Sequence, residues 1–248
     1  MSHVLSSLDA KTGIKPTTRA SYYRLLLPVI DLSLDDPEIM SWVQTIPNPN
    51  TKRATLIALR SVGYEYEGTK PKVTRSFPRR YDIPDEESLR LMASYSKYEV
   101  QLLTMMYLGL RLGEACIVSR KDLMPGSRIY ISKQVAEWSE NNKRMTEVRE
   151  PKSAAAVIDC PPWLAERLPK LPTPLVPTNV RAALHWTSKR YLGTLVNPHM
   201  LRHFYVTYMV RAGVPLPVVQ RQARHADIKT TMVYTDLQSY RMGLFDNM

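Results

Sequence analysis

The chain has 248 residues, and its 34 lysine and arginine residues exceed its 23 aspartate and glutamate residues, which gives a formal net charge of +11. This length allows one large or two modest domains with a hydrophobic core, and the positive charge favours a polyanionic partner. No apolar run approaches the roughly 18 residues of a membrane span, and the N-terminus lacks a secretory signal pattern. Cys116 and Cys160 lie far apart in the sequence and fit no metal-ligand spacing. We therefore expect a protein that works in the cytoplasm, without a membrane partner and without a bound metal.

The first 68 residues are predicted to form a small helical unit. Residues 1 to about 15 are expected to be a loose tail. Apolar residues at helical spacing then predict helices at 17–29, after Asp36, and from Thr51 onward. Three short basic helices could lie against a nucleic-acid duplex. The basic residues expected to contact DNA, in this unit and just after it, are Arg19, Lys52, Arg53, Lys70, Lys72, Arg75, Arg79 and Arg80.

A basic, proline-rich segment separates this unit from the rest of the chain. Residues 69–83 show little hydrophobic periodicity, so they are predicted to be a linker. Their charge suggests that the linker runs along phosphates. The expected organisation is a helical DNA-binding domain at 1–68, a basic linker at 69–83 and a second domain at 84–248.

An arginine stands at an unusual place early in the second domain. The apolar segment 98–108 is predicted to be a buried helix that ends at Gly109, and Arg111 follows almost directly. A charge that emerges from a buried helix needs a partner, and Glu114, one helical turn later, is placed to hold the guanidinium. The alternative is a simple solvent-exposed pair of the two side chains.

The middle of the second domain is predicted to contribute a few short strands. A Pro-Gly turn precedes a strand at about 128–132, and residues 146–149 and 155–159 look like the two strands of a hairpin with Lys152 at its turn. A helix is predicted at 179–191. The predicted fold class is therefore mainly α with a small antiparallel β-sheet.

The segment 197–236 concentrates polar residues that suit phosphate chemistry. Asn197 and the proline after it predict a helix start, on which His199 and Arg202 share one face. The opposite, core-facing positions of this helix are Leu201, Phe204, Tyr205, Tyr208 and Met209, and Gly213 ends it.

Two further short helices are predicted to follow that segment's first helix. One spans about 217–224 and ends next to His225, and the other is capped by Asp227 and carries Thr230 and Tyr234 one turn apart. Tyr234 stands nine residues after His225. Cationic and imidazole groups thus converge, by sequence, on one phenol.

These motifs resemble those of the tyrosine recombinase family, which includes phage integrases and Xer-type resolvases. The family pattern G-x-R-x-x-E matches Gly109 to Glu114, and H-x-x-R matches His199 and Arg202. A Gly-His pair followed nine residues later by the nucleophilic tyrosine is also typical. This chain has Arg224 in place of that glycine, which leaves the spacing intact but raises the question of whether the turn keeps its geometry.

The resemblance implies a helical core-binding domain joined to a mixed α/β catalytic domain, here 84–248. It implies that Tyr234 attacks the phosphodiester to form a 3'-phosphotyrosyl link and a free 5'-hydroxyl. Arg111 and Arg202 would bind the phosphate oxygens, His225 would donate a hydrogen bond and His199 would act as base. The lysine that acts as acid in the family matches Lys152, with Lys143 as the alternative if the strands are shifted in register. Neither a cofactor nor a metal is expected.

Rival residues and rival functions remain at this point. Tyr240 competes with Tyr234, and His203 with His199, although neither has the family spacing. The favoured function is a site-specific recombinase that integrates or excises a phage or mobile element in a bacterial host cell, similar to minimal integrases that lack an arm-binding domain. It would act on double-stranded DNA with core-type attachment sites, as a homotetramer on paired sites, and a directionality factor is a further candidate partner. The alternatives are a Xer-type dimer resolvase, a type IB topoisomerase and a non-catalytic helix-turn-helix regulator.

Overall fold

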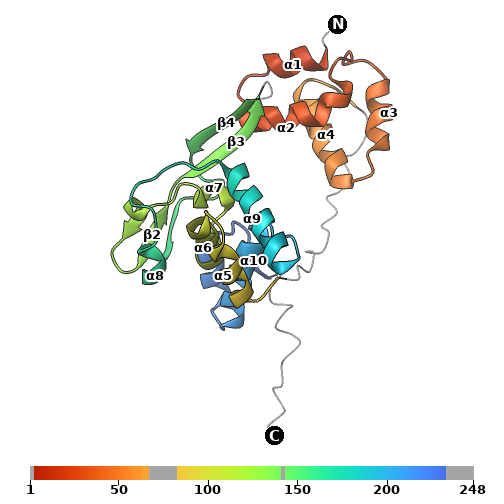
Figure 1. Ribbon diagram of the computed structural model, residues 1–248. Helices are drawn as coiled ribbons and strands as arrows, with labels where there is room; N and C mark the ends of the chain where they lie inside the picture. The colour runs from red at the N-terminus through yellow and green to blue at the C-terminus, as the bar shows by residue number, and fades with distance from the viewer. Residues whose placement is uncertain (1–2, 67–82, 141–142, 233–248) are drawn as a thin grey trace. The chain divides into compact units, whose positions relative to one another are not determined.

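The computed structural model describes residues 3–66, 83–140 and 143–232, and Figure 1 shows their helices and strands. The chain divides into two compact units. Unit 1 consists of residues 1–79 and 138–145, and unit 2 consists of residues 80–137 and 146–248. Helices dominate and the strands are few and short, so the predicted mainly α fold class is confirmed.

Unit 1 is a cluster of short helices around its own hydrophobic core (Figure 1). The expectation of a loose tail before residue 15 was wrong, because Val4 and Leu8 are fully buried in that core. They are four residues apart, so they share one face of a short helix. The backbone amide of Val4 also donates to the carbonyl of Leu32. The helices of unit 1 are α1 (Val4–Ala10), α2 (Pro16–Leu26), the 3-10 helix η1 (Leu27–Val29), α3 (Glu38–Thr45) and α4 (Pro49–Ser61).

Side chains accept hydrogen bonds from backbone amides at the starts of α3 and α4. Asp36 accepts from the amide of Glu38 at 2.8 Å, but α3 begins one residue later than predicted, with Pro37 at the N-cap position. Helix α4 begins two residues earlier than the predicted Thr51, because the Asn48 side chain accepts from the amides of Asn50 and Thr51 at 2.9 and 3.2 Å. A capping asparagine followed by proline is a strong start signal that the sequence analysis placed too late.

Unit 2 has a larger core in which α10 packs against α6, and α5 against α9 (Figure 1). The predicted cap of α5 is present, since the Asp85 carboxylate accepts from the amide of Ser88 at 2.9 Å. One predicted core position was wrong: Tyr208 is 52% exposed and stacks on Phe204 instead. The helices of unit 2 are α5 (Glu86–Ser94), α6 (Glu99–Tyr107), α7 (Leu112–Ala115), η2 (Arg120–Asp122), α8 (Pro162–Ala165), α9 (Pro177–Leu192), α10 (Pro198–Arg211), α11 (Leu216–Ala223) and α12 (Lys229–Met232).

The strands form two separate sheets. The first is antiparallel in the order β1-β2-β5, and in the second β3 pairs with β4. The predicted hairpin between 146–149 and 155–159 was therefore wrong, because β4 and β5 belong to different sheets. Alternation of apolar and polar residues identifies strands but does not name their partners. The strands are β1 (Leu123–Met124), β2 (Arg128–Ile131), β3 (Gln134–Glu140), β4 (Lys143–Arg149) and β5 (Ala156–Asp159).

Among the helices that the structure describes, none has both the length and the apolar character needed to cross a membrane.

Candidate active site

Arg111 is positioned by a sharp turn after the buried helix α6. Gly109 has a φ of 60°, which is the left-handed region that glycine adopts at low cost. A β-carbon at Gly109 would also lie 2.5 Å from the ring of Tyr205, so the turn has no room for a side chain. This turn places Arg111 at the N-terminus of α7, directly beside the core of unit 2.

Glu114 holds Arg111 from within the first turn of α7. Its carboxylate is 1% exposed and accepts a hydrogen bond from the backbone amide of Arg111 at 2.7 Å. The Arg111 guanidinium lies 3.4 Å from the same carboxylate and donates to the Ser153 hydroxyl at 2.7 Å. The pairing that the sequence spacing suggested is therefore present, mainly through the backbone amide.

Arg202 reaches the site from the first half of α10. The Asn197 side chain caps this helix by accepting from the amide of Met200 at 3.1 Å, as predicted. Arg202 is buried, and its guanidinium donates to the backbone carbonyls of Gly109 and Ala223. Burial and the positive charge of Arg111 lower the pKa of Arg202 to about 9, so the side chain stays charged at neutral pH.

Arg224 is a site residue whose place the sequence analysis missed. It ends α11 in the left-handed conformation, with φ 55° and ψ 47°, and it is only 6% exposed. Its guanidinium donates to both carboxylate oxygens of Glu114, at 3.0 and 2.5 Å. The only signal in the sequence was that an arginine stands where the family pattern has glycine.

The two predicted site histidines have lowered pKa values. Burial, followed by the positive charges of Arg202 and Arg111, lowers the pKa of His225 to about 4. Desolvation and the same two arginines also lower the pKa of His199. Both imidazoles are therefore neutral at pH 7. His225 Nδ1 lies 2.9 Å from the Thr231 hydroxyl, which leaves Nε2 for another partner.

These shifts predict that the stability of unit 2 falls as the pH drops from about 6.5 to about 4. Burial lowers the pKa of His203 and of His225 to about 4, so in this range the unfolded chain binds more protons than the folded one. We expect a loss on the order of 2–3 kcal/mol for the two residues together, since both are partly exposed. Urea unfolding at pH 7.0, 5.5 and 4.5 measures it. His203→Gln should flatten the pH dependence, and an unchanged slope in that variant would contradict the assignment.

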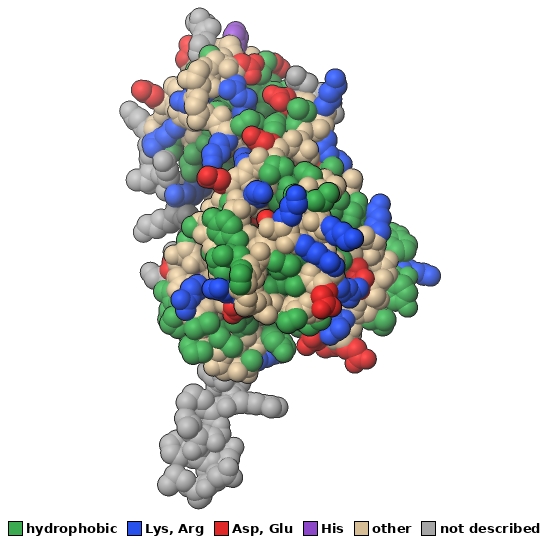
Figure 2. Space-filling view, turned by 90° about the vertical axis from the view of Figure 1, so that its left-hand side faces the viewer, with side chains coloured by type: hydrophobic (Ala, Val, Ile, Leu, Met, Phe, Trp, Pro, Cys, Tyr) green, Lys and Arg blue, Asp and Glu red, His purple; other side chains and the backbone are tan. Residues whose placement is uncertain are grey.

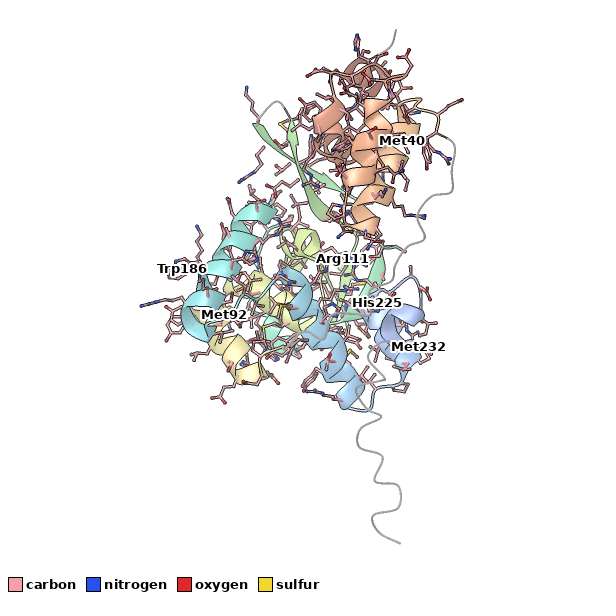
Figure 3. All side chains as sticks on the ribbon, turned by 90° about the vertical axis from the view of Figure 1, so that its right-hand side faces the viewer. Met40, Met92, Arg111, Trp186, His225 and Met232 are labelled. Carbon is pink, nitrogen blue, oxygen red and sulfur yellow. The ribbon has the colours of Figure 1, made fainter. Side chains whose placement is uncertain are left out.

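A pocket of about 320 Å³ opens next to these residues. None of the described residues that line it is acidic. Helix α9 contributes two lining groups, Arg181 and His185, which the sequence analysis did not select; their spacing of four residues on a predicted helix was the available signal. The lining residues are Leu110, Arg111, Leu112, Arg181, His185, Asn197, Pro198, His199 and Arg202. In Figure 3, Arg111 and His225 lie close together in unit 2.

The remaining predicted catalytic residues are a lysine, which the structure describes, and a tyrosine, which lies outside the described residues. Lys152 is exposed in the connection from β4 to β5, and its charge is one of those that lower the pKa of His199. The alternative, Lys143, lies at the start of β4. Tyr234 and its rival Tyr240 lie outside the described residues, so the structure does not place either phenol.

Some of the predicted DNA-contacting residues lie in unit 1, and the others lie outside the described residues. In unit 1, Arg19 donates to the carbonyls of Leu8, Asp9 and Lys11 at the end of α1, and Lys52 donates to the Gln44 side chain at 2.8 Å. Arg53 lies on α4. Figure 2 shows lysine and arginine side chains at many places on the face that it presents. The residues that lie outside the described part of the chain are Lys70, Lys72, Arg75, Arg79 and Arg80.

The described residues also bear on metal binding. No group of three or more histidine, cysteine, aspartate or glutamate residues among them is arranged to hold a metal ion. Three guanidiniums, those of Arg111, Arg202 and Arg224, lie near the carboxylate of Glu114, and Arg181 adds a fourth at the pocket. An excess of fixed positive charge of this kind suits an anionic ligand.

Comparison with known proteins agrees with this chemistry. Residues 82–241 match the phage integrase family. The tyrosine recombinase XerC of Haemophilus ducreyi is 26% identical over 93% of this chain and 87% of its own length. XerC of Proteus mirabilis is 28% identical over 67% of this chain, and the match covers 57% of the length of that relative. The fold is similar to that of the Tn1549 transposon integrase, solved in complex with transposon right end DNA, with a TM-score of 0.68, 15% identity and 94% of both chains covered. Because the family match covers more than half of the chain, the protein belongs to the phage integrase family of tyrosine recombinases.

Proposed function

We propose that the protein is a site-specific DNA recombinase that cleaves and rejoins DNA strands through a 3'-phosphotyrosyl intermediate at Tyr234. The observation that carries this proposal is the cluster of Arg111, Arg202 and Arg224 around one carboxylate, beside a pocket without acidic lining. A phosphodiester gains negative charge in the transition state of its cleavage, so fixed guanidiniums stabilise that state more than the ground state.

The arginines are suited to hold the scissile phosphate. Arg202 is fixed by the carbonyls of Gly109 and Ala223, and each of its terminal nitrogens carries a second N–H that remains available for a phosphate oxygen. Arg111 borders the same pocket. Both groups are held before DNA arrives, so little reorganisation is needed when the charge develops.

Proton transfers complete the reaction. The phenol oxygen of Tyr234 forms a bond to phosphorus as the bond from phosphorus to the 5'-oxygen breaks. A neutral His199 takes the phenol proton, and the Lys152 ammonium gives a proton to the departing 5'-oxygen. His225, neutral and held at Nδ1 by Thr231, donates from Nε2 to a phosphate oxygen. Attack by a 5'-hydroxyl of a partner strand reverses these steps and reseals the DNA without added energy.

The domain roles and partners follow from the same proposal. Residues 1–68 and the linker 69–83 bind double-stranded DNA at core-type sites, and residues 84–248 catalyse the reaction. A homotetramer assembles on two paired sites in the cytoplasm of a bacterial cell, and a directionality factor selects integration or excision of a phage or mobile element. Similarity to XerC over most of the chain supports a second candidate, the resolution of chromosome or plasmid dimers.

The decisive experiment traps the covalent intermediate. Duplexes that the protein selects from a random DNA library are resynthesised with a single nick near the centre of the site and incubated with protein in EDTA. The products are separated on a denaturing gel. We expect a protein–DNA adduct with the wild type and with Tyr240→Phe, and none with Tyr234→Phe. Tight DNA binding without any adduct would instead indicate a regulator, and relaxation of supercoiled plasmid that lacks a selected site would indicate a topoisomerase.

A further inference from the structure

Arg224 is a buried arginine in a backbone conformation that residues with a β-carbon rarely adopt. Among the described residues, only Ser127 and Arg224 combine a positive φ with a side chain. The left-handed conformation costs roughly 1–2 kcal/mol for a residue with a β-carbon. Burial of a charged group costs several more unless the charge is paired. The interactions of Arg224 must offset both costs.

The Glu114 carboxylate offsets these costs by pairing with Arg224, and it contacts the Arg224 guanidinium more closely than that of Arg111. Arg224 approaches both of its oxygens, at 3.0 and 2.5 Å, in the two-pronged arrangement that is strongest between these groups. The guanidinium of Arg111 lies farther away, at 3.4 Å from one of the oxygens. Arg111 instead donates to the Ser153 hydroxyl at 2.7 Å and contacts the carboxylate more closely through its backbone amide.

This division has an electrostatic consequence for Arg111. A single carboxylate can neutralise one guanidinium, and here the closer contact belongs to Arg224. Without Arg224, the buried carboxylate would retain Arg111 as its nearest cation. The Arg111 side chain would then be drawn toward Glu114, and less of its charge would act on a phosphate in the pocket.

We propose that Arg224 is a positioning residue that acts as the counter-ion of Glu114 and thereby reserves the guanidinium of Arg111 for the scissile phosphate. The inference rests on the proposed function, because it assigns Arg111 to the phosphate. It assigns a role to a residue that replaces the glycine of the family pattern. The side chain contacts no DNA in this proposal and acts only through Glu114.

The test is a double-mutant cycle between positions 224 and 114, read by single-turnover cleavage of the nicked duplex and by DNA affinity. Arg224→Gly removes the counter-ion and keeps the left-handed turn unstrained. We expect its cleavage rate to fall by about 10-fold to 100-fold with DNA affinity unchanged, the size of effect that a misplaced catalytic group produces. Arg224→Lys keeps the charge without the two-pronged contact, so it should recover part of the rate.

The double variant Arg224→Gly with Glu114→Gln tests whether Arg224 acts through the carboxylate. It removes the unmatched carboxylate, while the glutamine oxygen still accepts from the Arg111 amide, so cleavage should return to within a few fold of the wild type. Hydrogen exchange of the α10 amides under the assay conditions separates this role from a structural one, because a purely structural role predicts slow cleavage only where unit 2 of Arg224→Gly is partly unfolded. Arg221→Ala, which removes an exposed arginine from the same helix, is the matched control for loss of one positive charge.

Four outcomes decide the matter. Wild-type cleavage by Arg224→Gly overturns the inference, as does an impaired single variant that Glu114→Gln does not restore. A wild-type protein that forms no adduct overturns the proposed function itself, which distinguishes that failure from a failure of the counter-ion role. Slow cleavage by Arg224→Gly together with recovery in the double variant establishes it.

Discussion

Arg202→Lys is expected to reduce formation of the covalent adduct by about 100-fold to 1,000-fold, which corresponds to the loss of a fixed donor to the transition state. The Arg202 guanidinium is anchored by two backbone carbonyls, those of Gly109 and Ala223. A lysine ammonium is a single point and cannot bridge both carbonyls while it also donates to a phosphate. Single-turnover cleavage of the nicked duplex measures the effect.

Measurements of DNA affinity separate an effect of this substitution on cleavage from an effect on binding. Arg202 is buried, so its exchange for lysine should change the affinity for uncleaved DNA by much less than the cleavage rate. Arg211→Lys, at the exposed end of the same helix, conserves charge in the same way and should cleave normally. An Arg202→Lys protein that forms the adduct within tenfold of the wild-type rate would remove Arg202 from the proposed phosphate site.

Glu114→Ala is expected to lower the free energy of unfolding of unit 2 by roughly 3–5 kcal/mol, the cost of removing one partner from a buried ion pair. The substitution leaves the 6% exposed Arg224 without its carboxylate and removes the acceptor for the Arg111 amide. Hydrogen exchange of the α10 amides under increasing urea measures this change, because it reports on unit 2 alone.

The size of that loss depends on the charge as well as on the shape of the side chain. Glu114→Gln should cost less than Glu114→Ala, because the amide oxygen still accepts one hydrogen bond from each neighbour. Glu147→Ala, which removes an exposed carboxylate from β4, should change the stability by no more than about 0.5 kcal/mol. Equal stability of Glu114→Ala and the wild type would show that Arg224 finds another partner or reaches solvent.

Local sequence signals predicted most of the helices of unit 2 that the structure describes. Capping residues marked the starts of α5 and α10 because Asp85 and Asn197 satisfy backbone amides within three residues of themselves. The spacing of His199 and Arg202 also placed them on one helix face, because a helix repeats every 3.6 residues whatever surrounds it. The resemblance to tyrosine recombinases rested on such local motifs and identified the family.

The sequence was less informative wherever partners are distant. It identified strands at 146–149 and 155–159 but paired them wrongly, since pairing depends on which edges meet in space. It also treated Val4 and Leu8 as part of a loose tail, because two apolar residues in seven give a weak pattern without the core that covers them.

By itself, then, the sequence determined the family and the class of reaction, because the motifs that identify them consist of residue types at short, fixed spacings. Only the tertiary structure decided how the charges are paired. Arg224 and Glu114 are separated by 110 residues and Arg202 and Gly109 by 93, and no periodic pattern spans such distances. A buried charge takes its partner from whichever segment the fold brings beside it, and here that partner is a carboxylate 110 residues earlier in the sequence.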